Sequence, residues 1–222
     1  MAIKICVLIP SYNEARTIGR IVKDLRAKGL IVYVVDDGST DETSSISLSN
    51  GALIIRHEKN MGKGASLRDG FSRIVSEGYD AVLVMDGDDQ HEVSSVSEFI
   101  STMEATGADI VIGNRMNDTS RMPFVRIVTN RFMSYLISRI ARHRVPDTQC
   151  GFRLIKTDVL KKIELRSSNF ETESEFIIKA ARSGFRIESI PIKALYRDEK
   201  SKINPIIDTF RFVKLLLRIA KG

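Results

Sequence analysis

The sequence of 222 residues contains no tryptophan, and aromatic residues make up only 7% of it. This scarcity argues against a stacking platform for nucleic acid, although the pI is about 9.4. The sequence has two cysteines, Cys6 and Cys150, which are too few for a disulfide framework and lack the spacing of a metal site. We therefore expect no nucleic-acid partner, and a reducing compartment suits the two thiols.

Long apolar runs are also missing. The apolar run at the N-terminus ends at Pro10, which is too short for a signal peptide or a membrane span. No window reaches about 18 uninterrupted apolar residues, the length that would indicate a transmembrane helix. We expect neither a signal peptide nor a transmembrane helix, and a cytoplasmic location.

The net charge of +6 is unevenly distributed along the chain. Residues 80–92 contain five acids and no Lys or Arg, whereas residues 119–146 contain six Arg and no acid. Residues 193–222 contain eight Lys or Arg and three acids. Solvated faces would give the same pattern, but the separation favours a cation at one place and anionic partners at two others.

The first half of the sequence alternates between strand and helix patterns. Apolar strands are predicted at 3–9, 30–35, 52–55, 81–85 and 109–112, and helices begin near Asn13, Thr40, Gly62 and Val93. Apolar strands that alternate with helices predict an α/β fold, a doubly wound and mostly parallel sheet with helices on both faces. Ligands of such sheets bind at the carboxyl ends of the strands.

The second half follows a different pattern. We predict a long Arg-bearing helix at about 122–142, a loop at 146–151, a helix near 173–183 and a strand pair at about 186–195. A final helix begins at Pro205. No linker interrupts the chain, so residues 1–204 are expected to form one unit that the helix 205–222 follows.

Acidic residues follow the fourth predicted strand. Asp86 and Asp88, separated by Gly87, can direct carboxylate oxygens at one hard cation such as Mg²⁺ or Mn²⁺, and Gln90 can add a neutral oxygen. Gly87 lets a diphosphate approach the backbone. An acidic turn that caps the next helix is the competing interpretation.

Two further motifs follow the second and third strands. Asp36 and Asp37 can accept hydrogen bonds from a ribose hydroxyl or a base, although a simple strand–turn–helix connection would look the same. Lys63 lies between two glycines at a helix start, where a phosphate would find a cation, but the spacing is not that of a P-loop. Each of these turns alone is weak evidence for a ligand site. The combination of these turns with the acidic motif after the fourth strand is much stronger evidence than any one of them.

The complete series of motifs resembles the family 2 glycosyltransferases of the GT-A fold, and within them the dolichyl- or polyprenyl-phosphate sugar synthases. The resemblance covers roughly residues 3–202. It depends on Ile9–Glu14, Val34–Asp41, Asn60–Gly64, Asp86–His91, Gly113–Arg115 and Asp147–Arg153. The sequence departs from the family pattern at Glu199–Lys202, where the glycine that usually precedes the Ser-Lys pair is absent, and it lacks the transmembrane helices of many members.

The resemblance implies a role for individual residues. The nucleotide-sugar half would be 1–113 and the acceptor half 114–204. The metal ion would bind Asp86, Asp88 and Gln90. The donor nucleotide would bind Pro10, Tyr12, Glu14, Asp36, Asp37, Lys63, Asp86 and Gly87. The acceptor phosphate would bind Arg115, Arg126, Arg197 and Lys202. The catalytic residues would be Asp88, Asp147 and Arg115.

The expected activity is inverting, metal-dependent transfer of a hexose from a nucleotide sugar of the UDP-glucose or GDP-mannose type to polyprenyl or dolichyl phosphate. Transfer to a saccharide hydroxyl in polysaccharide or cell-wall assembly is the alternative. That reaction would need a general base, for which Asp147 is the candidate. A nucleotide-binding module without catalysis is a third interpretation, which the presence of both Asp86 and Asp88 disfavours.

The predicted terminal helix has one basic edge. Arg211, Lys214, Arg218 and Lys221 recur at helical spacing, and most of the remaining residues are apolar. Such a helix can lie in a membrane interface, dock on a membrane-embedded partner protein or pack on the domain. We expect a protein that is peripheral to the cytoplasmic face of a membrane.

Overall fold

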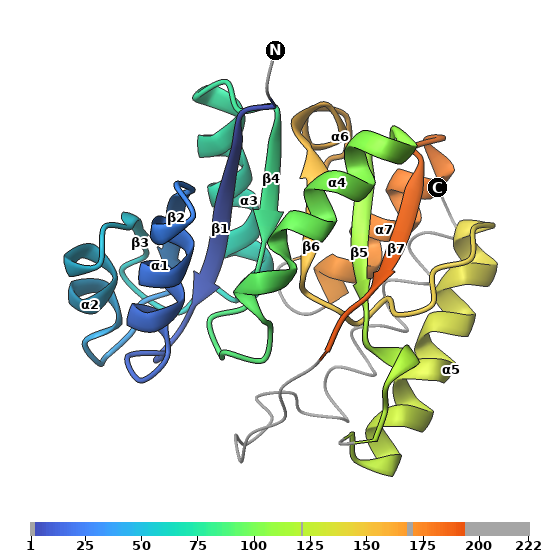
Figure 1. The fold of residues 1–222 in the computed structure, drawn as a ribbon, viewed down its shortest axis with the longest axis horizontal. Coiled ribbons are helices and arrows are strands. Elements are labelled where there is room, and N and C mark those ends of the chain that lie inside the picture. The colour runs from blue at the N-terminus through green and yellow to red at the C-terminus, as the bar shows by residue number, and fades with distance from the viewer. Residues whose placement is uncertain (1–2, 121, 168–170, 194–222) are drawn as a thin grey trace.

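The computed structural model describes residues 3–120, 122–167 and 171–193. The helix predicted at 205–222, together with Arg197 and Lys202, lies outside the described residues. The described residues form one seven-stranded sheet in the order β3-β2-β1-β4-β6-β5-β7 (Figure 1). The strands are β1 (Ile5–Ser11), β2 (Ile31–Asp36), β3 (Leu53–Arg56), β4 (Ala81–Val84), β5 (Ile110–Asn114), β6 (Arg153–Lys156) and β7 (Ile187–Pro191).

Strand direction confirms a mostly parallel, doubly wound sheet. From β1 the chain winds outward through β2 to β3, then returns to place β4 on the other side of β1. All neighbouring pairs are parallel except the two that β6 makes, with β4 and with β5. Because β1, β2 and β4 are covered on both faces, their residues are apolar almost throughout and nearly all buried.

Helices cover both faces of the sheet. In Figure 1, α1 and α4 lie toward the viewer, and α3 and α7 lie behind the strands. Helix α5 packs against α7 at the edge of the molecule that β7 forms (Figure 1). The helices are α1 (Ile18–Ala27), α2 (Thr43–Ser49), α3 (Lys63–Ser76), α4 (Val96–Thr106, after the 3₁₀ turn Val93–Ser95), α5 (Phe124–Ala141), α6 (Thr157–Lys162) and α7 (Glu171–Arg182), and the 3₁₀ turn Arg115–Asn117 follows β5.

Three sequence-based expectations need correction. Strand β6 and helix α6 were not predicted, because Arg153–Lys156 is short and carries a charge at each end. The strand pair predicted at 186–195 is wrong within the described residues, since that region holds one strand, β7, which pairs in parallel with β5. Helix α1 begins at Ile18 and not near Asn13, because Asn13 has a left-handed backbone with φ of 55°.

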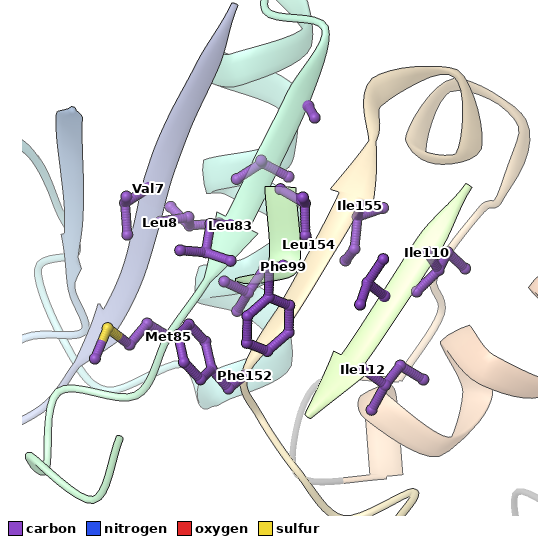
Figure 2. Packing of buried hydrophobic residues seen from close by; sticks show 14 of the residues in the cluster. Val7, Leu8, Leu83, Met85, Phe99, Ile110, Ile112, Phe152, Leu154 and Ile155 are labelled. Atoms are coloured by element: carbon purple, nitrogen blue, oxygen red, sulfur yellow. The ribbon is translucent and has the colours of Figure 1, made fainter. Parts of the chain in front are cut away.

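The apolar core extends through the middle of the sheet. Figure 2 shows Met85, Phe99 and Phe152 in its lower part, below Leu83 and Leu154. The rings of Phe99 and Phe152 lie 4.3 Å apart, so α4 is fixed on the strand segment that leads into β6. This packing joins the two halves of the chain directly beneath the carboxyl end of β4. Among the described residues, no helix is both long enough and apolar enough to cross a bilayer.

Candidate active site

The loops that follow β1 and β2 are bonded to each other. Asn13 exchanges hydrogen bonds with the second loop: its backbone N–H donates to Ser39 Oγ, and its side-chain oxygen accepts from the Thr40 N–H. The Glu14 N–H donates to Thr43 Oγ1 at 2.8 Å. The structure therefore brings the segment of Tyr12 and Glu14 beside the turn that carries Asp36 and Asp37.

Asp36 and Asp37 are both buried and bound by protein groups. Asp36 accepts hydrogen bonds from the Ser39 N–H at 2.9 Å and from Ser44 Oγ. Asp37 accepts from the backbone N–H groups of Met61 and Gly62, each at 2.8 Å. Asp36 therefore shapes its own turn, whereas Asp37 fixes the loop that leads to Lys63.

Lys63, the first residue of α3, joins the two halves of the chain. Its Nζ lies 2.6 Å from Asp86 Oδ1 and 2.9 Å from Glu173 Oε1 on α7. Burial alone would lower the pKa of Lys63, but the two carboxylates outweigh it and raise this pKa. Burial opposes ionisation of Asp86 as well, yet Lys63 and His91 hold the pKa of Asp86 far below its ordinary value.

Asp88 has a different electrostatic environment from Asp86. Burial, and then the negative charge of Asp86, raises the pKa of Asp88. The Gln90 N–H donates to Asp88 Oδ1 at 3.1 Å, which closes the turn after β4. Lys63 pairs with Asp86, whereas no Lys or Arg is paired with Asp88 among the described contacts, so the second carboxylate lacks a positive partner. A divalent cation would supply that charge.

Gly87 and Gly151 allow chain segments to approach the carboxylates closely. A Cβ on Gly87 would lie 2.9 Å from Ser11 Oγ, a buried hydroxyl without a hydrogen-bond partner among the described residues. A Cβ on Gly151 would lie 2.3 Å from Asp86 Oδ2. The loop before β6 therefore packs directly on the acidic motif, and only a glycine fits there.

Three residues at this site were given no role from the sequence. Glu173 binds Lys63, and His91 stacks on Phe152 with its Nε2 3.6 Å from Asp86 Oδ2. Ser11 and His91 belong to two of the motifs that carry the family resemblance, Ile9–Glu14 and Asp86–His91. The sequence therefore placed both residues near the site but did not indicate their contacts. The contact of Glu173 joins residues far apart in the chain, and no local pattern marks it.

Arg115 and Asp147 form a buried, bidentate ion pair. Arg115 Nε and Nη2 lie 2.7 Å and 3.0 Å from the two oxygens of Asp147, and the Arg115 N–H also donates to this carboxylate. The Asp147 side chain is 0% exposed. A general base needs a lone pair that faces the acceptor, and this geometry instead gives Asp147 the part of a positioning residue for Arg115.

Two of the four expected acceptor residues, Arg115 and Arg126, lie in the described structure. Arg126, in the first turn of α5, is half-buried, and the N-terminal end of α5 lies beyond the carboxyl ends of β5 and β7 (Figure 1). Arg197 and Lys202 lie outside the described residues. The structure therefore brings together the donor set and, separately, Arg115 with Asp147.

A mostly parallel sheet of this order, with an acidic turn after its central strand β4, is the arrangement of the GT-A fold. The chain belongs to glycosyl transferase family 2, whose family profile matches residues 6–164. Family membership confirms that the protein is a glycosyltransferase.

Relatives and solved structures agree with this family. The chain is 32% identical, over 97% of its length and 92% of the relative's, to a protein of Methanocaldococcus jannaschii without an assigned function. It is 28% identical to the UDP-N-acetylglucosamine–dolichyl-phosphate N-acetylglucosaminyltransferase of Methanococcus voltae, over 87% of the chain and 86% of the relative. It is 26% identical to a dolichyl-phosphate hexose transferase of Haloferax volcanii, over 97% and 93%.

Among solved structures, glucosyl-3-phosphoglycerate synthase from Mycobacterium tuberculosis, in complex with Mn²⁺, UDP and glucosyl-3-phosphoglycerate, matches with a TM-score of 0.75 at 17% identity. The match covers 98% of this chain and 80% of that one. It confirms the predicted GT-A fold. A second structure of that synthase contains Mg²⁺ and UDP, so both cations occur with a nucleotide on this fold.

Proposed function

We propose that the protein transfers a hexose from a nucleotide sugar, of the UDP-glucose or GDP-mannose type, to a polyprenyl or dolichyl phosphate. The observation that carries the proposal is the contrast between two neighbouring regions. Asp86, Asp88 and Lys63 form a charged cluster at the carboxyl ends of the central strands, and the helix beside that edge belongs to a stretch with six Arg and no acid. The first suits a diphosphate with its cation, and the second suits a lipid phosphate. Two relatives named as dolichyl-phosphate transferases support the choice of acceptor.

Asp86, Asp88 and Gln90 would hold a Mg²⁺ or Mn²⁺ ion. The described residues contain no group of three or more His, Cys, Asp or Glu that could bind a metal by themselves. Two carboxylates and an amide are nevertheless a common protein contribution for these ions, because substrate phosphates and water complete the shell. When bound, the cation stabilises as a Lewis acid the negative charge that grows on the departing diphosphate.

Lys63 would provide the second positive charge for that diphosphate. Its ammonium lies beside Asp86 at the start of α3, where backbone N–H groups also favour an anion. Glu173 holds the other side of the ammonium and keeps the side chain within reach. The nucleoside would lie against Pro10, Tyr12 and Glu14, between the two bonded loops, with Asp37 fixing the loop that carries Lys63.

The acceptor phosphate would bind Arg115, Arg126, Arg197 and Lys202. Its oxygen is already anionic at neutral pH, so the protein needs to orient it and not to deprotonate it. Asp147 fits this requirement because it holds the Arg115 guanidinium in one orientation. Attack of that oxygen on the anomeric carbon as the diphosphate leaves would be a direct displacement and would invert the configuration.

A location at the cytoplasmic face of a membrane follows from a lipid acceptor. The purified protein should be assayed with Mn²⁺ or Mg²⁺, a panel of radiolabelled nucleotide sugars and a short polyprenyl phosphate, followed by extraction into organic solvent. We expect label in the organic phase with one donor, and no label when a chelator removes the cation. Metal-dependent nucleotide binding without any lipid product would contradict the proposed acceptor.

A further inference from the structure

Helix α5 exposes an apolar face. Five of the eight exposed large apolar side chains among the described residues lie on this helix. They are Phe124, Val125, Val128, Phe132 and Tyr135, with exposed fractions from 51% to 78%. Four of them follow each other at intervals of four, four and three residues, so they form one stripe along the helix, called here the α5 stripe.

The amphipathic pattern of α5 is partly inverted. The face that packs on the domain is formed by Asn130, Ser134, Ile137 and Ala141, two of which are polar. Ser134 bonds to Thr148 in the loop before β6. A helix that buries polar residues and exposes aromatic ones is not arranged for contact with water alone. The α5 stripe therefore has the composition of a contact surface.

The charge around the stripe restricts what can cover it. Arg131 and Arg139 are exposed on the same side of the helix as the stripe, and residues 119–146 contain no acid. Two copies of the chain that met through this stripe in a symmetric contact would bring these arginines together. The terminal residues 193–222 are themselves basic, with eight Lys or Arg against three acids, so they are a poor match for the same reason. An anionic and apolar surface is complementary.

We infer that the α5 stripe docks on the surface of a lipid bilayer that contains anionic headgroups. Apolar side chains would enter the interface, and the arginines beside them would meet the headgroups. In Figure 1 the N-terminal end of α5 projects on the side of the sheet where the strands end and the acidic motif lies. Docking would bring the candidate active site toward the membrane. This inference rests on the proposed function and deepens it, because it supplies the membrane surface from which a lipid acceptor would approach the candidate active site.

The test is cosedimentation of the full chain with vesicles of phosphatidylcholine alone or mixed equally with phosphatidylglycerol. We expect binding to the mixed vesicles and at least about tenfold weaker binding to phosphatidylcholine alone. The double variant Phe124→Ser/Phe132→Ser should bind the mixed vesicles about tenfold more weakly, because both side chains leave the stripe. The matched control is Leu48→Ser/Leu53→Ser, which removes two exposed apolar residues from α2 and β3 and should bind like the wild type.

The remaining outcomes overturn the inference. Wild-type binding by the Phe124→Ser/Phe132→Ser variant would assign the membrane contact to another segment, such as residues 205–222. Absence of vesicle binding by the wild type, together with a dimer that this variant abolishes, would assign the stripe to contact between copies. An unchanged melting temperature shows that the variant folds. Vesicle binding uses neither donor nor acceptor, so failure of the transferase assay and failure of this test are separate results.

Discussion

The two halves of the chain, residues 1–113 and 114–204, differ in which of their described side chains they bury and which they expose. In the donor half, the acids at the strand ends are bonded to protein groups: Asp36 and Asp37 hold their loops, and Asp86 binds Lys63. In the acceptor half, α5 packs through Asn130 and Ser134 and leaves an apolar, arginine-flanked face exposed. The difference fits the proposal of a donor site that is largely formed before the nucleotide binds, beside an apolar face that would dock on a membrane.

Pre-formation of the donor site has a specific basis. Each loop after β1, β2 and β3 is held by a side chain of another loop, so little conformational entropy remains to be lost when the nucleotide binds. Among the described residues, nothing covers the apolar stripe of α5 in the same way. Variants in the donor half should therefore change nucleotide or metal binding, and variants on α5 should change only the use of the acceptor.

The largest effect is expected for Asp88→Ala. The kcat for sugar transfer should fall by about 10²–10³-fold or more. The cation would lose a carboxylate ligand, and the negative charge on the departing diphosphate would then be stabilised less. The fold should not be weakened: the raised pKa of Asp88 means that its ionised form opposes folding at neutral pH. Measurements of kcat and of thermal unfolding check both statements. Glu98→Ala, an exposed acid on α4, is the control; near-normal activity of Asp88→Ala would refute the metal assignment.

The substitution Lys63→Met should have opposite effects on the binding of the nucleotide and on the binding of the metal ion. UDP should bind about 10- to 100-fold more weakly, since a charge-assisted contact to the diphosphate is lost. Mn²⁺ should bind the nucleotide-free protein more tightly, because Asp86 no longer shares its charge with an ammonium at 2.6 Å. Calorimetric titrations with each ligand measure both effects, with Lys59→Met in the preceding loop as the control. Weaker binding of Mn²⁺ as well would show that Lys63 is needed only to hold the site together.

Arg126→Ala should affect the acceptor half alone. The KM for polyprenyl phosphate should rise about tenfold. The Kd for the nucleotide should stay unchanged, since Arg126 belongs to α5 and the proposed donor residues belong to the loops after β1 to β4. Arg144→Ala, which changes an exposed arginine in the loop after α5, should leave both values near those of the wild type. Equal rises in KM for both arginines would indicate a general electrostatic attraction and not a phosphate site.

The smallest effect concerns the two cysteines, one in each half. Burial raises the pKa of both Cys6 and Cys150 to about 12, so almost no thiolate exists at neutral pH. Neither should react with iodoacetamide until the protein is unfolded, and mass spectrometry after timed labelling checks this. Labelling of Cys150 alone in the folded protein would show that the acceptor half opens while the donor half stays closed.

Local patterns predicted most of the donor half and less of the acceptor half. The strands β1 to β5 and the acidic turns could be predicted, because each of these strands is an apolar run that ends where polar or glycine residues begin. Strand β6 could not be predicted, since Arg153 and Lys156 resemble loop residues. Arg153 donates to backbone carbonyls of Thr148, Cys150 and Glu173, and Lys156 pairs with the distant Asp109. The contact of Lys63 with Glu173 and the exposure of the α5 stripe depend on how distant elements pack, which no local spacing specifies.

The most direct test of the account is a single reaction that offers both kinds of acceptor at once. Wild-type protein, Mn²⁺ and the labelled donor identified in the panel assay would be incubated with equal amounts of a short polyprenyl phosphate and a soluble oligosaccharide mixture. We predict that the label moves to the organic phase as an acid-labile lipid-linked product. Label that stays in the water-soluble saccharides, with none in the lipid, would contradict the account.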